Sequence, residues 1–485
     1  MTTPSRERRT LSGDLGTGSI AFMVIAAAAP LTVIGGNAPL AIGQGNGAGA
    51  PMGFLLASLV LLLFSVGFVA MTPHVTEAGA FFSYVSRGLG SRPGMGTAFV
   101  ALVTYTAIQA GIYGYLGWAV RDLVRTYGGP ELPWILYALA ALGIVALLGY
   151  RHIELSSRVL GTALVLELLV MLVVDVAVIA DGGPEGRSLT SFDPQVFLTG
   201  GLGVAVLFAM TGFIGFESTA IYRDEARHPE RTIPRATYLA VAIIGAFYTL
   251  SVWVLVLGAG PSSVTDVARD TLFGSGNMLL DTAGAHAGAL TRNLMQVLLI
   301  TSLFACVLSF HNIIARYQFA LARIGSLPAV LATVHPRHGS PATSSLLQSA
   351  TAAVIAVACL AIGLDPLVEV FGYLAGVATI GMVMMLLLTT LGVLVFFRRH
   401  PERAARRWTT LIVPILAVLA LCVAAWLVLT NFTLVTSGSA AVSTGLALIA
   451  PVAFVLGMVV GRRDHGGQGA DTSAGPAGSD SEDAG

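Results

Sequence analysis

The chain has 485 residues and a formal net charge of zero; 55% of its residues are hydrophobic and only 11% are charged. Soluble domains carry about 25% charged residues, so this composition excludes an ordinary soluble protein and predicts an integral membrane protein. The balanced charge gives no sign of a nucleic-acid partner. The 3 cysteines fall in apolar segments, where they indicate packing and imply no disulfide framework.

Apolar windows of about 20 residues, the length of a helix that crosses a bilayer, recur along the whole chain. We expect twelve membrane-spanning helices, at residues 20–41, 51–72, 94–118, 133–150, 155–180, 198–222, 236–258, 292–314, 343–363, 367–397, 409–430 and 440–461. All 26 cationic residues are arginine, and most of them fall in alternate loops. The positive-inside rule then places both termini in the cytoplasm and the protein in the cytoplasmic membrane.

The segments outside these windows complete the predicted layout. Residues 1–11 are expected to form a cytoplasmic tail, and residues 464–485 are polar and glycine-rich enough to form a disordered one. Residues 73–93 are typical of an amphipathic cytoplasmic connector. Residues 259–291 form the longest outside loop, which is either a plain surface loop or contains a short helix over the outer vestibule.

Two glycine- and proline-interrupted segments stand about 180 residues apart, at 26–39 (AAAAPLTVIGGNAP) and 211–216 (TGFIGF). Each opens a block of five predicted helices, at residues 12–180 and 195–397. Interrupted segments in matching places of two halves indicate an inverted repeat, because an odd number of helices makes the second half enter from the opposite side. The last two helices, within residues 409–461, lie outside the repeat.

Three stretches then resemble the amino acid–polyamine–organocation transporter superfamily: TEAGAFFSYVSRGLG (76–90), GFIGFESTAIYRDEARHPERTIPRA (212–236) and NIIARYQFALARIGSLPAVLATVHPRHGSP (312–341). The resemblance covers roughly residues 12–460. It implies an all-α membrane protein with the leucine-transporter fold, in which helices one and six are broken, and it implies transport by alternating access.

The first interruption is a candidate anion site. Pro30 has no N–H and disrupts the preceding turn, and Gly35 and Gly36 accept unusual dihedral angles. The N–H groups freed here would suit a substrate carboxylate; the alternative is a simple proline kink. The predicted binding residues are Pro30, Leu31, Thr32, Val33, Ile34, Gly35 and Gly36.

The second interruption offers backbone carbonyls, which suit an ammonium group, so the two interruptions together favour a zwitterion. An aromatic side chain here is either a gate or ordinary packing. The predicted binding residues are Phe208, Ala209, Thr211, Gly212 and Phe213. Glu217 follows directly; a carboxylate is costly in lipid, so Glu217 faces inward and either titrates or holds neighbouring helices by hydrogen bonds.

Two polar stripes on other helices could line the same cavity. Tyr105 and Gln109 share one helix face with Tyr113. Ser302, Cys306 and Ser309 form a similar stripe, although serine hydroxyls often bond only to their own helix.

Glu167 is the candidate coupling residue, because it falls about 18 Å into the fifth helix, near the bilayer midplane. By the resemblance, several relatives have a lysine at this point, whose ammonium stands in for a sodium ion beside helix one. Glu167 would either carry a proton or bind Na⁺ together with hydroxyls such as Ser309; the alternative is an inert, hydrogen-bonded carboxyl. Glu217, Ser302 and Ser309 complete the candidate coupling residues.

The leading hypothesis is a secondary active transporter that moves an amino acid or related amine, coupled to H⁺ or Na⁺. A polyamine permease or an amino acid exchanger is an alternative within the class, and a membrane enzyme or a non-transporting receptor is an alternative outside it. The chain has no HExxH or GxSxG motif, which argues against an enzyme. Nothing in it predicts a cofactor, a metal or a nucleotide; the expected partners are the small substrate, the ion and the lipid bilayer.

Overall fold

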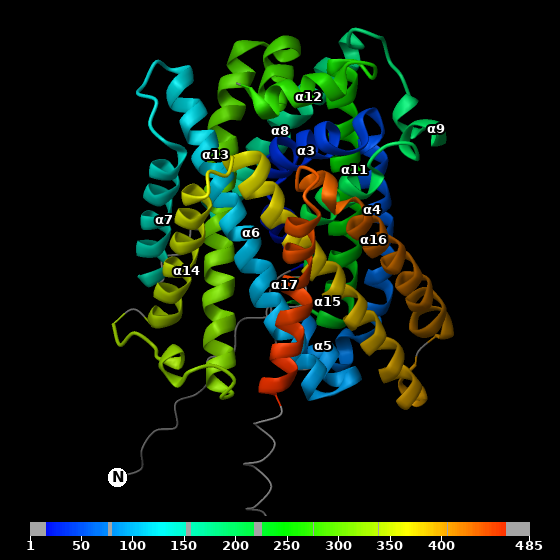
Figure 1. The fold of residues 1–485 in the computed structure, drawn as a ribbon. Coiled ribbons are helices and arrows are strands. Elements are labelled where there is room, and N and C mark those ends of the chain that lie inside the picture. Colours follow the sequence, from blue (N-terminus) through cyan, green and yellow to red (C-terminus); the bar gives the residue numbers. More distant parts are fainter. Residues whose placement is uncertain are drawn as a thin grey trace, which may run out of the picture.

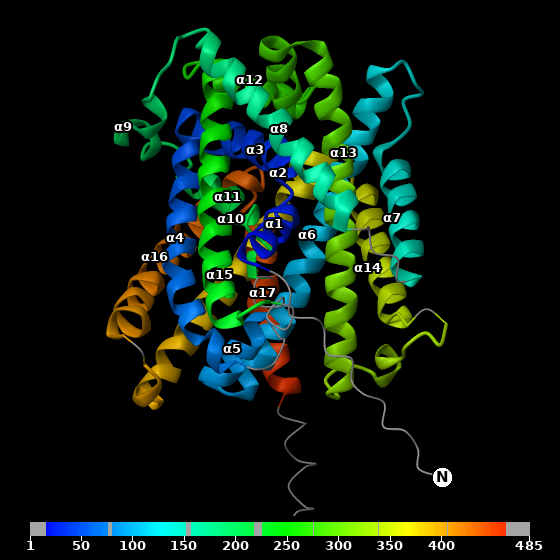
Figure 2. The ribbon, with the colours of Figure 1, turned by 180° about the vertical axis from the view of Figure 1, so that it is seen from behind.

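A computed structural model describes residues 16–75, 80–151, 157–217, 226–274, 276–337, 339–404 and 406–461. In these ranges the chain forms a bundle of long helices that run roughly along one direction (Figures 1 and 2). The long helices are α4 (Ala50–Met71), α6 (Ser91–Thr126), α7 (Trp134–Tyr150), α8 (Ser157–Asp181), α11 (Pro229–Ala259), α13 (Met278–Arg323), α14 (Ala342–Ala361), α15 (Gly372–Arg399), α16 (Val413–Val435) and α17 (Ala440–Val460).

Shorter helices and turns connect or interrupt the long ones. The short α-helices are α1 (Thr17–Ala27), α2 (Pro30–Thr32), α3 (Ala38–Ala41), α5 (Ala80–Leu89), α9 (Pro194–Phe197), α10 (Leu202–Thr211) and α12 (Val264–Phe273). The π and 3₁₀ turns are η1 (Val33–Asn37), η2 (Ile42–Asn46), η3 (Gly47–Gly49), η4 (Thr72–His74), η5 (Thr190–Phe192), η7 (Ala329–Ala332), η8 (Pro366–Phe371), η9 (Pro401–Arg403) and η10 (Trp408–Ile412).

The apolar windows of the sequence coincide with helices. Within the described ranges, 9 helical segments are long and apolar enough to cross a membrane, and the first of them, Thr17–His74, covers the first two predicted windows. The fourth and sixth windows contain the shorter apolar helices Trp134–Tyr150 and Leu202–Thr211. A multi-pass helical membrane protein is therefore confirmed, whereas the count of twelve and the inverted repeat stay predictions.

The first interruption lies within the predicted segment 26–39, just before the expected break from Pro30 to Gly36. α1 ends at Ala27, Ala29 has a left-handed backbone with φ 46°, and Pro30 begins the next helix. Pro30 starts a helix because its fixed φ and missing N–H suit the first helical position, while proline disfavours helical geometry in the residue before it. The expected break from Pro30 to Gly36 is instead wound as α2 and the π-turn η1, Val33–Asn37.

The second interruption follows α10. The helix ends at Thr211, and the chain turns through residues 212–217, where Gly215 has φ 109°. Side chains rarely adopt that backbone conformation, so glycine permits the turn. The end of the predicted sixth window, with residues 218–225, lies outside the described residues, and α11 begins at Pro229.

The bundle has two distinct ends, here called the α12 end and the α5 end (Figure 1). The predicted short helix in loop 259–291 is α12, which packs across α3 and η2, and the connector at 73–93 contains α5, which packs on α6 and α15. Its preceding residues 76–79 lie outside the described ranges.

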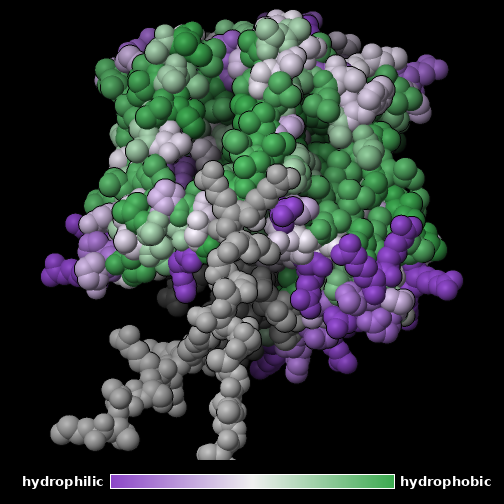
Figure 3. Space-filling view, turned by 60° about the horizontal axis from the view of Figure 1, so that its bottom comes forward, coloured by the Kyte–Doolittle hydropathy of each residue, from purple (hydrophilic) through white to green (hydrophobic). Residues whose placement is uncertain are grey.

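Polar residues gather at the α5 end, while the sides of the bundle are apolar (Figure 3). Arg323 closes α13 and Arg399 closes α15 at this end, and the walls expose aliphatic side chains such as Val176. This distribution fits a bilayer around the walls. The cytoplasmic orientation of the α5 end stays a prediction, and the tails at 1–11 and 464–485 lie outside the described residues.

Candidate functional site

A small cavity lies where the two interruptions face each other. Its volume is about 20 Å³, which is room for little more than one water molecule. The first interruption contributes Ala28, Ala29, Thr32, Val33 and Asn37, the second contributes Thr211, Gly212 and Ile214, and the rest of the lining is Ile108 and Ile112 of α6, Cys306 and Phe310 of α13, and Phe371 of η8. Segments far apart in the sequence therefore meet at one point inside the bundle.

Direct contacts hold the two interruptions together. The Asn37 side chain donates a hydrogen bond to the carbonyl of Phe208 over 2.8 Å. The Tyr248 hydroxyl of α11 donates to the carbonyls of Ala28 (2.9 Å) and Gly212 (3.4 Å). A Cβ at Gly212 would come within 2.9 Å of a methyl group of Val33, so the close approach requires glycine. The two interruptions thus form one packed unit around the cavity.

The predicted carboxylate site has a different environment from the one expected. The N–H of Leu31 donates to the Glu167 carboxyl, and the N–H of Val33 donates to the carbonyl of Ala29 over 3.3 Å. Of the seven residues predicted from Pro30 to Gly36, Thr32 and Val33 line the cavity, and the others are buried in the packing around it. A substrate carboxylate at these N–H groups stays a prediction.

Gly35 and Gly36 pack against an aromatic ring. A Cβ at Gly36 would lie 2.7 Å from Cε1 of Tyr115, and one at Gly35 would lie 2.7 Å from the Tyr115 hydroxyl oxygen. Asn277 donates to the Gly35 carbonyl over 3.2 Å. The two glycines therefore let Tyr115 approach the backbone of η1, a contact that the sequence analysis did not anticipate.

Carbonyl groups of the second interruption already accept hydrogen bonds from backbone N–H groups. The carbonyl of Ala209 accepts from the N–H of Gly212 (3.1 Å), and that of Thr211 accepts from Ile214 (3.1 Å). A carbonyl has two lone pairs, so each retains capacity for a second donor such as an ammonium group. Thr211 and Gly212 line the cavity, as predicted for binding residues.

The two predicted gate candidates are placed behind the cavity wall. Phe208 and Phe213 are both fully buried, and the ring of Phe213 packs on Tyr248 at a centroid distance of 5.7 Å. The aromatic rings in the cavity lining are instead Phe310 and Phe371. Both lie far from the interruptions in sequence, so no local signal identified them.

Aromatic pairs flank the cavity toward both ends of the bundle. α6 passes it with Tyr105, Ile108, Ile112 and Tyr115 in order, and the two isoleucines line it. Toward the α12 end, Tyr115 packs on Phe371 at 5.4 Å between centroids. Toward the α5 end, Tyr105 packs on Phe310 at 6.0 Å. The two aromatic pairs therefore lie on either side of the cavity along α6, one toward each end of the bundle.

The side chain of Gln109 forms hydrogen bonds to neighbouring helices. Its amide donates to the carbonyl of Val307 over 3.0 Å and accepts from Gln348 over 2.6 Å. These bonds join α6 to α13 and α14. The structure thus gives Gln109 a packing environment, and a substrate contact by Gln109 stays a prediction.

Glu217 joins the second interruption to α6. The hydroxyl of Tyr105 donates to Glu217, and the N–H of Gly215 donates to it over 3.0 Å. Glu217 is buried and does not line the cavity. This geometry supports the structural alternative, in which Glu217 anchors the end of α10.

We expect Tyr105→Phe to destabilise the protein by about 1–3 kcal/mol, because a buried carboxyl would lose a hydrogen-bond donor. Thermal unfolding in detergent measures this as a lower midpoint. Glu217→Gln keeps an acceptor for Tyr105 and should lower the midpoint less. An unchanged midpoint in Tyr105→Phe would show that the bond does not stabilise the fold.

Glu167 is connected to the cavity wall by hydroxyl groups. Ser302 of α13 donates to Glu167 over 3.0 Å, and the Thr32 hydroxyl donates to Ser302 over 3.4 Å. Glu167 is buried and also receives the Leu31 N–H. The predicted partner Ser309 lies two helical turns from Ser302, about 10 Å along the axis. Ser302 is thus the hydroxyl that contacts Glu167.

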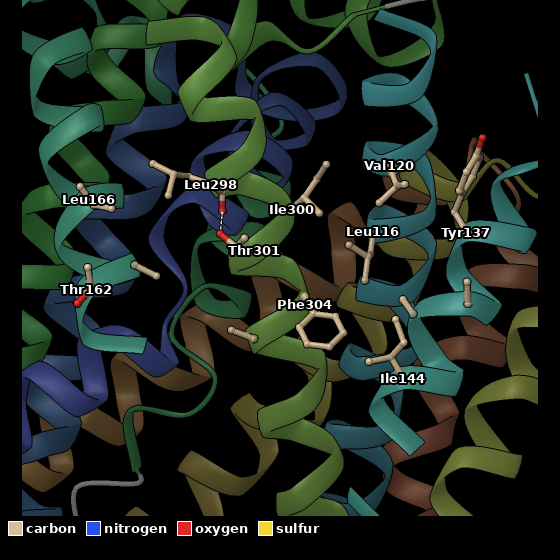
Figure 4. A pocket seen from close by; sticks show the side chains of 14 residues that line it. Leu116, Val120, Tyr137, Ile144, Thr162, Leu166, Leu298, Ile300, Thr301 and Phe304 are labelled. Atoms are coloured by element: carbon tan, nitrogen blue, oxygen red, sulfur yellow. Dashed lines mark hydrogen bonds between the residues drawn. The ribbon is translucent and has the colours of Figure 1, made fainter. Parts of the chain in front are cut away.

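A larger apolar groove lies beside this site, with a volume of about 840 Å³. Figure 4 shows Leu166 of α8 and Ile144 of α7 on opposite sides of the groove, with Phe304 of α13 between them. Its lining is almost entirely apolar and offers no charged group. A carboxylate or ammonium group would lose its hydration there without compensation, so the small central cavity is the candidate substrate site.

The sequence analysis missed several residues of the site. Asn37 carried a usable signal, because it is an amide within an apolar window directly after Gly35 and Gly36. Tyr248 gave none, since it reaches the interruptions only through the packing of α11.

A helical bundle that crosses the membrane several times, with a cavity between two interruptions, fits a membrane transport protein. The chain belongs to the amino acid permease family, whose model matches residues 15–466. It is similar to the branched-chain amino acid permease BcaP of Bacillus subtilis, with 23% identity over 85% of this chain and 87% of the relative.

Two further relatives are named for other substrates. The low-affinity putrescine importer PlaP of Escherichia coli is 24% identical over 75% of this chain and 77% of its own length. The methylthioribose transporter of Bacillus subtilis is 22% identical over 79% and 80%. The resemblance to the amino acid–polyamine–organocation superfamily is confirmed, and the family and these relatives are permeases, not enzymes.

Proposed function

We propose that the protein is a secondary active transporter of the cytoplasmic membrane that moves an amino acid by alternating access. One observation carries the proposal: the central cavity lies between the two interruptions, and Ser302 links its wall to the buried carboxyl of Glu167. A substrate site and a candidate ion site thus share Thr32. Movement of one interruption is expected to change both.

The closed cavity supports alternating access. A volume of about 20 Å³ excludes an amino acid, so binding requires one aromatic pair to separate. Separation of Tyr115 from Phe371 would open the α12 end, and separation of Tyr105 from Phe310 would open the α5 end. Opening one pair at a time gives access from one side at a time.

The cavity lining favours an amino acid with an apolar side chain. Its polar side chains are Thr32, Asn37 and Thr211, its thiol is Cys306, and the remaining side chains are apolar. No carboxylate lies in the described lining to pair with the second ammonium group of a diamine, and an unpaired buried charge is costly. This argues against the polyamine alternative.

We expect purified protein in proteoliposomes to take up leucine, isoleucine or valine, and to take up putrescine at least about tenfold less well, a difference of about 1.4 kcal/mol. Radiolabelled uptake into vesicles with an imposed pH or sodium gradient measures this, with protein-free vesicles as the control. Tight binding without uptake would favour a receptor. Preferential putrescine uptake would replace the amino acid proposal with a polyamine permease.

Coupling is proposed to act through Glu167. If the ion is H⁺, the carboxyl carries it; if the ion is Na⁺, the oxygens of Glu167, Ser302 and Thr32 are the available side-chain ligands. In either case the ion would lie beside helix one, because Ser302, which donates to Glu167, also accepts from Thr32. An exchanger would leave uptake insensitive to both gradients.

A further inference from the structure

A second buried carboxyl lies on the same helix as Glu167. Asp175 of α8 is 1% exposed, and one of its oxygens accepts a hydrogen bond from Ser251 of α11 over 2.9 Å. Its other oxygen, Oδ1, is fully buried and has no hydrogen-bond partner among the described residues. A buried polar group without a partner is costly, and an asparagine or serine would satisfy the contact to Ser251. The packing therefore gives no reason for an acid.

Asp175 occupies the middle of three polar levels along α8. Glu167 bonds to Ser302 at the first level, Asp175 bonds to Ser251 at the second, and Asp181 bonds to His286 of α13 at the third, over 2.8 Å. At a rise of about 1.5 Å per residue, the levels are about 12 Å and about 9 Å apart. Figure 2 shows α8 crossing α11 and α13 toward the α12 end.

The third level reaches the surface. Asp181 is 66% exposed at its side chain, and His286 also contacts the carbonyl of Gly258 on α11 over 3.4 Å. α11 therefore runs alongside the three levels of α8, with Gly258 at the outermost level and Ser251 beside Asp175. Tyr248, one turn below Ser251, bonds to the interruptions at the cavity. The three levels connect the surface at the α12 end to the central site.

The surroundings of Asp175 suit a proton better than a divalent metal ion. Divalent metal ions take about six oxygen ligands, whereas Asp175 and Ser251 supply only the two carboxyl oxygens and one hydroxyl. α1 and α2 carry no titratable side chain. Of the several titratable residues of α11 and α13, those along the three levels are Tyr248 toward the cavity, His286 at Asp181 and Cys306 near Glu167. Asp281 of α13 interacts with Arg292 and Asp122 instead. No charged group among the described residues acts on Asp175.

We propose that Asp175 is a second proton-carrying residue, which relays protons between the α12 end and Glu167. The inference rests on the proposed proton coupling at Glu167. The Asp175 carboxylate accepts a proton that enters at Asp181 and His286, and then releases it toward Glu167. The gaps between levels exceed one hydrogen bond, so water must enter when the α12 end opens. In the closed structure no hydrogen bonds connect the three levels to one another, which prevents a proton leak.

The test is Asp175→Asn in proteoliposomes, with Glu131→Gln as the matched control in the exposed loop between α6 and α7. Two quantities are measured: substrate-driven proton movement with a pH-sensitive dye, and the infrared band of protonated carboxyl groups. We expect Asp175→Asn to lose one such band, to lose at least about tenfold in proton-driven accumulation, and to keep exchange of pre-loaded substrate. Glu131→Gln should behave as the wild type in both measurements.

Three results would overturn the relay. Proton-driven accumulation at the wild-type level in Asp175→Asn, while Glu167→Gln has lost it, would reject Asp175 and leave the role of Glu167 intact. Wild-type transport without proton movement would reject both the relay and proton coupling. Loss of exchange together with accumulation in a folded Asp175→Asn protein would show a structural contact at Asp175 and also overturn the relay.

Discussion

Glu167→Gln is expected to abolish concentrative uptake while sparing exchange of pre-loaded substrate. Glutamine keeps an acceptor for Ser302 and Leu31 but can neither carry a proton nor charge-balance a sodium ion. A potential of 100 mV is worth about 2.3 kcal/mol per elementary charge, or roughly a 50-fold concentration ratio. Loss of one coupled charge should reduce accumulation by about that factor at this potential.

Two serines of α13 provide the matched comparison for this prediction. Ser302→Ala removes the hydroxyl that contacts Glu167 and should weaken gradient-driven uptake. Ser309→Ala lies two turns away and should leave it near the wild-type level. Uptake in Glu167→Gln that still follows the pH or sodium gradient would exclude Glu167 as the coupling residue. Equal effects of the two serine variants would contradict the observed contact.

Gly36→Val is expected to abolish uptake by displacing an aromatic ring. A Cβ at Gly36 would lie 2.7 Å from Tyr115 and 3.2 Å from Phe371, the pair that closes the cavity toward the α12 end. Overpacking of this kind costs about 1–3 kcal/mol, which leaves a folded protein with a lower unfolding midpoint. Substrate affinity should fall at least about tenfold, or 1.4 kcal/mol, as measured by ligand-induced shifts in thermal unfolding.

Gly143→Val is the control for this substitution, because a Cβ at Gly143 on α7 meets no atom within 4 Å. It should retain uptake. The double variant Gly36→Val with Tyr115→Ala should recover part of the lost unfolding midpoint, since it removes the ring that clashes. Wild-type affinity and uptake in Gly36→Val would mean that the contact between η1 and Tyr115 has no part in closing the cavity.

The apolar helices could be predicted because they follow from a local property of the sequence, whereas the depth of Glu167 in the membrane stays a prediction. An apolar window of about 20 residues specifies a spanning helix, and counting along a helix at 1.5 Å per residue places a side chain in depth. The expectation that Glu167 stands beside helix one agrees with its contact to Leu31.

Details of backbone conformation and long-range contact could not be predicted in the same way. The interruption at Ala28 and Ala29 depends on a left-handed residue before Pro30, and the sequence marked the segment 26–39 without identifying that residue. Which of Ser302 and Ser309 contacts Glu167 depends on the rotation of α13 relative to α8, and the sequence does not specify that rotation. Tyr248 reaches the cavity through the packing of helices far apart in the sequence.

The most direct test of the central claim, that the cavity between the two interruptions binds the substrate, uses a native cysteine. Cys306 lines the cavity, whereas Cys359 is partly buried elsewhere and Cys422 is exposed. In a Cys359→Ala, Cys422→Ala protein, a small thiol reagent should modify Cys306 and inhibit uptake, and saturating leucine, isoleucine or valine should slow the modification. Cys306→Ala should remove the inhibition. If the transported substrate leaves the rate of Cys306 modification unchanged, or if modified Cys306 leaves uptake intact, the substrate binds elsewhere and the account is wrong.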